Sequence, residues 1–255
     1  MASSPRRTGR QPRVRLASVS GVLPWLLFGL GLGAGALGAE THAADATAAV
    51  RAGSVSLPPA LVETLSSAGL IGRGEPVAAF DWTLETRRPM RAPRRVRERF
   101  DGGGPELPPG LSPVVHETLA PKPRPARRGI SVRGLTVVHP GDTVLDVQVQ
   151  GLQLPLAAGA HFRLDYEEEG SSLSQDCVAG ATRAASGVHP AMPGNARTIA
   201  CDGRGHYHGI PVRVGATVLY LEQLGVFLQV EQHIDTPVGR LRGSTRIIDF
   251  EMPRR

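Results

Sequence analysis

The chain has few cysteines and almost no lysine. Only two of its 255 residues are cysteine, and Lys122 is the single lysine among 29 basic residues. Two cysteines exclude a disulfide-dense scaffold and a zinc site made of four thiolates. A chain so poor in lysine and so rich in Ala, Gly and Pro reflects the composition of its genome. Its many arginines are therefore, by number alone, weak evidence for recognition of an anion.

The chain also lacks the short motifs that mark common active sites. It contains no G-x-S-x-G nucleophile elbow, no H-E-x-x-H zinc motif, no G-x-x-x-x-G-K phosphate loop and no G-x-G-x-x-G fingerprint opening a helix. A catalytic triad scattered along the sequence stays open, because serine and histidine are both present. An enzyme is nevertheless the less favoured class, and no cofactor is predicted.

The N-terminal segment has the order of an export signal. Its basic part has no acidic residue, and an apolar stretch follows over Gly21–Leu37. Small residues offer cleavage after Gly38 or after Ala43, and the alternative is an uncleaved membrane anchor. We therefore expect a signal peptide over residues 1–43 and a periplasmic or secreted protein, with membrane contact only if the segment is retained. The basic residues of this segment are Arg6, Arg7, Arg10, Arg13 and Arg15.

The net charge of the chain depends on this segment. Of the 29 basic residues, five lie in residues 1–39 together with no acid, which leaves 24 basic against 23 acidic residues in the remainder. The apparent basicity is thus largely a property of the export signal. A nucleic-acid partner is not predicted, because such partners are held mainly by excess positive charge.

Both cysteines lie in the part of the chain expected to reach an oxidising compartment, so we predict a disulfide between Cys177 and Cys201. A redox or metal-binding thiol pair is disfavoured because the C-x-x-C spacing is absent. The intervening segment, residues 178–200, has little strand periodicity and is expected to be an irregular loop. Closing a loop of this size contributes about 3 kcal/mol in the chain-entropy model.

Residues 44–128 are predicted to form an N-terminal arm. Proline before Ala60 and glycine after Ala68 bracket a short helix. Alternating residues over Ala79–Thr86 predict a strand, with Arg94–Phe100 as its partner in a hairpin. Two Pro/Gly-rich stretches are expected to be linkers, and the second would mark the boundary with the main domain. These stretches are Asp101–Pro109 and Pro121–Arg128.

Residues 129–255 predict an antiparallel β domain. Its strands alternate between apolar and polar residues, so each has one wet face, which is typical of antiparallel sheets. We therefore expect a mainly β fold: a curved antiparallel sheet, either a half-barrel or a sandwich, with one or two short helices. The clearest strands are Val144–Gln150, His161–Glu167, Val218–Leu221, Val226–Ile234 and Leu241–Glu251.

Two groups of residues are candidate sites. His206 and His208 would point the same way from a strand and share a metal ion if a third ligand lay near, whereas the alternative is a polar hairpin tip. Arg94, Arg95 and Arg97 belong to an arginine run that would contact membrane phosphates or an acidic polymer, whereas the alternative is a solvated edge hairpin.

The C-terminal strands resemble those of bacterial envelope proteins with an open, curved sheet of the periplasmic lipoprotein-carrier type. The resemblance rests on Leu219–Phe227, on Glu231 and on Ile248–Glu251. It implies a non-enzymatic role in which the concave face holds an acyl chain or a partner segment. We accordingly expect an exported, non-catalytic β domain that binds an envelope ligand or protein. The alternatives are a metal-binding protein or metal-dependent hydrolase, and a structural factor that contacts anionic surfaces.

Overall fold

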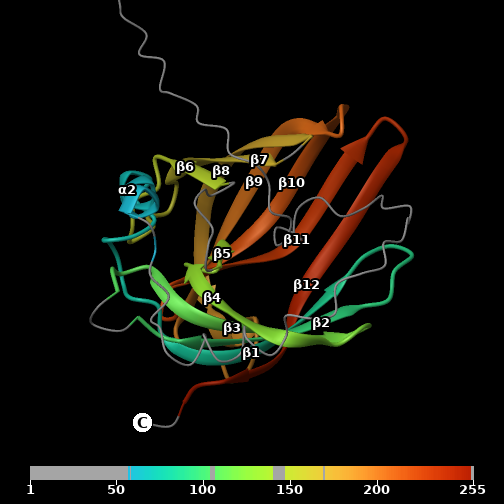
Figure 1. Cartoon of the computed structure of the whole chain (residues 1–255). Helices are drawn as coiled ribbons and strands as arrows, with labels where there is room; N and C mark the ends of the chain where they lie inside the picture. The colour runs from blue at the N-terminus through green and yellow to red at the C-terminus, as the bar shows by residue number, and fades with distance from the viewer. Residues whose placement is uncertain (1–56, 58, 104–106, 140–146, 169, 254–255) are drawn as a thin grey trace, which may run out of the picture.

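The computed structural model describes residues 57, 59–103, 107–139, 147–168 and 170–253 (Figure 1). The expected signal segment and its cleavage sites lie outside these residues, as do the first three residues of the strand predicted over Val144–Gln150. The described part is mainly β, with one α-helix and one short 3-10 helix in it. The predicted fold class is therefore confirmed.

Twelve strands form one antiparallel sheet in the order β5-β4-β3-β2-β1-β12-β11-β10-β9-β8-β7-β6. The sheet curves so strongly that it is nearly closed, as the half-barrel prediction requires (Figure 1). Its elements are α2 (Pro59–Ser67), β1 (Ala79–Arg87), β2 (Arg94–Asp101), β3 (Leu111–Ala120), β4 (Arg124–Val132), β5 (Thr136–Val138), β6 (Val147–Gln150), β7 (His161–Glu168), β8 (Ser171–Ala184), η1 (Ala185–Gly187), β9 (Asn195–Tyr207), β10 (Ile210–Leu221), β11 (Val226–Thr236) and β12 (Gly239–Glu251).

The predicted helix is present as α2. Proline occupies its first turn, and Gly69 follows its end with a φ of 72°, a left-handed conformation that glycine adopts without strain. Leu61 and Leu65 are buried in the same apolar cluster as Val138 of β5 and Val147 of β6. The helix thus packs on a core to which both edge strands contribute. No helix of the described residues is long and apolar enough to cross a membrane.

The strands of the C-terminal half are buried on both faces at one end. Tyr220 and Phe227 belong to one apolar cluster, whereas Leu219 and Leu228 belong to another. The expectation of one wet face along the whole of β11 is therefore wrong for its first residues. The physical reason is that the β4–β5 turn packs beside this part of β11, where the Phe227 amide donates to the Arg133 carbonyl at 2.7 Å.

Arg133 anchors the segment that joins α2 to β1. Its side chain is fully buried, with 0% exposure, and its guanidinium donates to main-chain carbonyl groups of four other residues. Burial lowers the pKa of this arginine. Because one side chain satisfies several buried carbonyl groups, it fixes the segment against the sheet. The carbonyl groups belong to Leu70, Arg73, Glu75 and Gly225.

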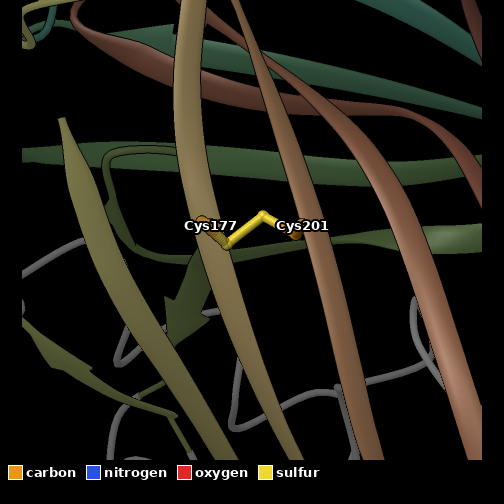
Figure 2. The surroundings of a disulfide bond; sticks show 2 residues. All are labelled: Cys177 and Cys201. Atoms are coloured by element: carbon orange, nitrogen blue, oxygen red, sulfur yellow. A yellow bond between two sulfur atoms is a disulfide. The ribbon is translucent and has the colours of Figure 1, made fainter. Parts of the chain in front are cut away.

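The segment between the cysteines is mostly strand and not the irregular loop that we expected. β8 and β9 form a long hairpin closed by η1, and Cys177 lies directly opposite Cys201 in their register. Their sulfur atoms form the predicted disulfide, with the Cα atoms 4.1 Å apart (Figure 2). Gly180, Gly187 and Gly194 interrupt the strand pattern between the cysteines. Gly203 and Gly205 interrupt it further along β9, where an added Cβ would meet the β8 main chain at 2.4 Å and 1.9 Å.

The structure also differs from the expected division into an arm and a domain. The boundary expected after residue 128 falls inside β4, and strands from both sides of it belong to the same sheet. Pro121 and Pro123 lie in the turn between β3 and β4, whereas Arg124–Arg128 are part of a strand. Paired strands tolerate these polar, proline-containing sequences because their neighbours supply the hydrogen bonds.

Candidate anion-binding surface

Three hairpin turns lie toward one end of the sheet. β1 pairs with β2 and with β12, and Arg87, the last residue of β1, lies opposite Ser244. β2 pairs in turn with β3, where Arg95 lies opposite Ala120. The β1–β2, β3–β4 and β11–β12 turns therefore lie toward the same end of the sheet, and the β11–β12 hairpin reaches farther because residues 239–243 of β12 continue past the end of β1, to the upper right in Figure 1.

The sequences at these tips are strongly basic. Residues 86–96 contain five arginines and no acidic residue, and residues 121–128 contain four basic residues and no acidic residue. Residues 239–246 add three arginines, of which Arg240 pairs with Asp235 on the facing strand, with Nη2 donating to Oδ2 at 2.7 Å. We call this surface the basic end. It comprises Arg87, Arg88, Arg91, Arg94, Arg95, Lys122, Arg124, Arg127, Arg128, Arg240, Arg242 and Arg246.

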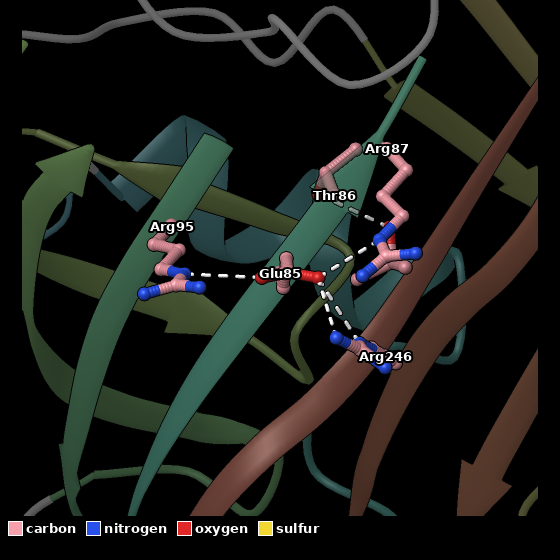
Figure 3. Close-up of polar contacts among 6 residues, drawn as sticks. Glu85, Thr86, Arg87, Arg95 and Arg246 are labelled. Carbon is pink, nitrogen blue, oxygen red and sulfur yellow. Dashed lines mark hydrogen bonds and ion pairs between the residues drawn. The ribbon is translucent and has the colours of Figure 1, made fainter. Parts of the chain in front are cut away.

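A single carboxylate organises three arginines of the basic end. Glu85 of β1 accepts from Nε of Arg87 at 2.9 Å and from Nε of Arg95 at 3.0 Å (Figure 3). Arg246 of β12 donates to Glu85 through Nε at 3.1 Å and through Nη2 at 2.8 Å. Three neighbouring strands thus hold three guanidinium groups around one negative charge, and the cluster stays net positive.

The same arginines cover Glu85. Its side chain is 2% exposed, whereas those of its three partners are 53–58% exposed. The hydrogen bond from Arg87, followed by those from Arg95 and Arg246, lowers the pKa of Glu85 from 4.5 to about 2, against an opposing effect of burial. The carboxylate therefore remains charged over the physiological range, and the outer faces of the arginines remain open to solvent.

The predicted contact residues Arg94, Arg95 and Arg97 do not share one face. Arg95 and Arg97 lie on the outer face, where Arg97 pairs with Asp81 at 3.5 Å. Arg94 alternates to the other face and is half-buried, and its pKa is lowered first by burial and then by the charges of Arg88 and Arg124. Like charges thus crowd together on this second face of the basic end.

A shallow depression opens beside the basic end where β11 and β12 separate. Their pairing stops at Glu231 and Ser244, and the depression measures about 250 Å³ including the space open to solvent. Val230 is the only aliphatic side chain in its lining, so a polar group fits it better than an acyl chain does. The lining consists of Thr86, Arg88, Gln229, Val230, Glu231, Gln232, Gly243, Ser244 and Thr245.

The two histidines of the metal hypothesis lie at a different hairpin tip. His206 is in β9, but His208 follows the strand with a φ of 47°, so the two side chains lack the same-face geometry of a strand. The His208 amide donates to the Gly170 carbonyl at 2.7 Å. In the parts of the chain that the structure describes, no group of three or more His, Cys, Asp or Glu residues is placed to hold a metal ion.

Sequence reasoning missed a buried polar group inside the sheet. Glu98 of β2 accepts from Nε1 of Trp82 at 2.8 Å, and its other oxygen lies 3.0 Å from Nδ1 of His116. These contacts join β1, β2 and β3 beside the basic end. The alternation of β2 gives a partial signal, because Glu98 shares a face with Val96 and Phe100 and is buried with them.

The fold and this surface define a disulfide-linked β domain with one strongly basic end. No family model and no curated protein matches the chain. Among solved structures, a Bacteroides fragilis chain described as a "putative exported protein with YmcC-like fold" is similar at 10% identity, covering 71% of this chain and 99% of that one, with a TM-score of 0.40. A likeness this distant carries no argument about function, and the lipoprotein-carrier type is not established.

Proposed function

We propose that this protein is an exported, non-catalytic β domain that binds an anionic surface of the cell envelope through its basic end. The observation that carries the proposal is the clustering of twelve basic residues on three adjacent hairpins, where Asp235 pairs with Arg240 and Glu85 with three other arginines. The disulfide supports export, because such bonds persist outside the reducing cytoplasm. Long-range attraction would both guide and hold an anionic partner there.

A surface contact is favoured over an acyl chain on the concave face. The aromatic and aliphatic residues on which that idea depends are already covered by the protein itself: Tyr220, Phe227 and Leu228 are at most 6% exposed. Side chains from β3, β4 and α2 share the cluster of Tyr220 and Phe227. The apolar surface that an acyl chain would need is therefore used for folding.

Charge reversal at the basic end tests the proposal. Arg91 and Arg124 are exposed and lie in two adjacent tips. We expect Arg91→Glu combined with Arg124→Glu to weaken binding to phosphatidylglycerol vesicles and to a sulfated polysaccharide by about 25-fold or more, since each basic residue near an anionic surface contributes about fivefold. Co-sedimentation and the salt concentration of elution from the immobilised polysaccharide measure the two effects.

The matched control places the same change in charge at the other end of the sheet. Arg73 precedes β1 in the chain and Arg183 lies near the end of β8, and both are exposed. Arg73→Glu combined with Arg183→Glu should leave both affinities within about twofold, because charges beyond one Debye length are screened. Equal losses in the two double variants would contradict a localised basic site.

A further inference from the structure

Two apolar side chains project from the tips of the basic end. Met90, in the β1–β2 turn, is 98% exposed, and Val238, in the β11–β12 turn, is 93% exposed. No other large hydrophobic side chain among the described residues exceeds 44% exposure. The two most exposed apolar residues thus occur at the turns of two hairpins that are neighbours in the strand order and point toward the same end of the sheet.

The local sequences at these two turns are alike. Each apolar residue directly follows a proline, and an arginine comes next in the β1–β2 turn and after one glycine in the β11–β12 turn. In both turns an exposed apolar side chain is therefore followed closely in sequence by an arginine, Arg91 in one and Arg240, which pairs with Asp235, in the other. This arrangement matches a membrane interface, in which apolar groups enter the acyl boundary while arginines contact the phosphates.

The backbone conformation at Met90 favours glycine over residues with a side chain, so the stability of the fold does not explain why methionine occupies this position. Its φ is +56°, a left-handed conformation that costs a residue with a Cβ about 1–2 kcal/mol and that glycine adopts freely. Glycine at this position would relieve that strain and would also remove an exposed apolar side chain. A strained, fully exposed methionine therefore points to a contact made outside the folded chain.

We propose that the Met90 and Val238 tips insert into the interface of an anionic lipid bilayer, with the arginines of the basic end on the lipid phosphates. This inference rests on the proposed anionic-surface function and narrows it to one source of anionic groups, the phospholipid headgroup. A soluble acidic polymer would satisfy the arginines but would leave both apolar tips in water. The apolar tips therefore distinguish a bilayer from a polymer.

Site-specific quenching by lipids brominated on their acyl chains tests the insertion. The protein would be used without residues 1–43, the expected signal peptide, so that the buried Trp82 is its only native indole and the apolar stretch of the signal does not bind the vesicles. We expect Met90→Trp and Val238→Trp to be quenched about twofold on phosphatidylglycerol vesicles, because interfacial side chains lie about 5–10 Å into the acyl boundary. The control is Met252→Trp, which changes an exposed methionine beyond the other end of β12.

A second variant distinguishes the effect of apolar insertion on vesicle binding from the effects of misfolding and of electrostatic attraction. Met90→Gly suits the left-handed backbone, so the protein should remain folded. It should lose about fivefold or more in vesicle affinity from the lost burial while keeping its affinity for the sulfated polysaccharide. Unchanged vesicle affinity, or equal quenching at Met90 and Met252, would overturn insertion while leaving the proposed function standing. If the unmutated protein bound neither the vesicles nor the polysaccharide, the proposed function itself would be overturned.

Discussion

At the scale of single residues, Glu85 shows how one buried acid can present positive charge. Its carboxylate fixes arginines from β1, β2 and β12, and their exposed sides form part of the basic end. The hydrogen-bond pattern could not be predicted from the sequence, which shows an arginine run but not the carboxylate at its centre. Arg133 was missed for the same reason, because its partners are main-chain carbonyl groups from distant loops.

The lowered pKa of Glu85 predicts a pH-dependent contribution to stability. A carboxylate whose folded pKa is about 2 and whose unfolded pKa is near 4.5 stabilises the fold fully above pH 4.5 and loses this contribution as the pH falls toward 2. We expect Glu85→Gln to lower the free energy of unfolding at pH 7 and the difference from the unmutated chain to vanish near pH 2. Urea denaturation at several pH values measures this, with Glu63→Gln on the exposed face of α2 as control. A difference that is independent of pH would contradict the ion-pair account.

At the scale of elements, regular alternation predicted strands well and glycine or proline hid them. β1, β2, β7, β11 and β12 follow their predicted positions closely because their apolar residues alternate. β8 and β9 were missed over most of their length because glycines interrupt the pattern, and β3 and β4 because prolines do. The helix was predictable from its flanking proline and glycine. The sequence of single strands, however, contains no information on the twelve-strand order, which depends on contacts between distant segments.

The disulfide joins the two strands that sequence patterns least define. We expect replacement of both cysteines, Cys177→Ala and Cys201→Ala, to lower the free energy of unfolding by about 3 kcal/mol, chiefly because the unfolded chain loses a covalent loop. Urea denaturation with and without a reducing agent measures this loss. The unmutated chain under reducing conditions should approach the double variant. If the double variant stayed within about 0.5 kcal/mol of the oxidised chain, the unfolded chain would have to be constrained by other means.

At the scale of the whole molecule, the positions of the basic residues say more about a binding partner than the net charge of the chain does. With residues 1–39 set aside, basic and acidic residues nearly balance, yet twelve of the 24 basic residues lie on three adjacent hairpins. The expectation from composition, that charge gives little evidence for a partner, overlooked this clustering because it depends on strand order. The arginine run was visible in the sequence, whereas the neighbouring tips of β3–β4 and β11–β12 could be placed beside it only by the fold.

This uneven distribution predicts how salt acts on binding. The Debye length falls from about 10 Å at 0.1 M to about 3 Å at 1 M ionic strength, so the arginines should lose most of their attraction for phosphatidylglycerol vesicles over this range. The contribution from the Met90 and Val238 tips is apolar and should persist. Titration of vesicle binding against salt should therefore show a steep fall to a residual plateau, with phosphatidylcholine vesicles close to that plateau throughout. Met90→Gly should lower the residual affinity at high salt, whereas charge reversal at Arg91 and Arg124 should reduce the size of the salt-dependent fall in affinity. A salt-independent affinity would contradict the basic end as the contact, and a fall to zero would contradict insertion of the tips.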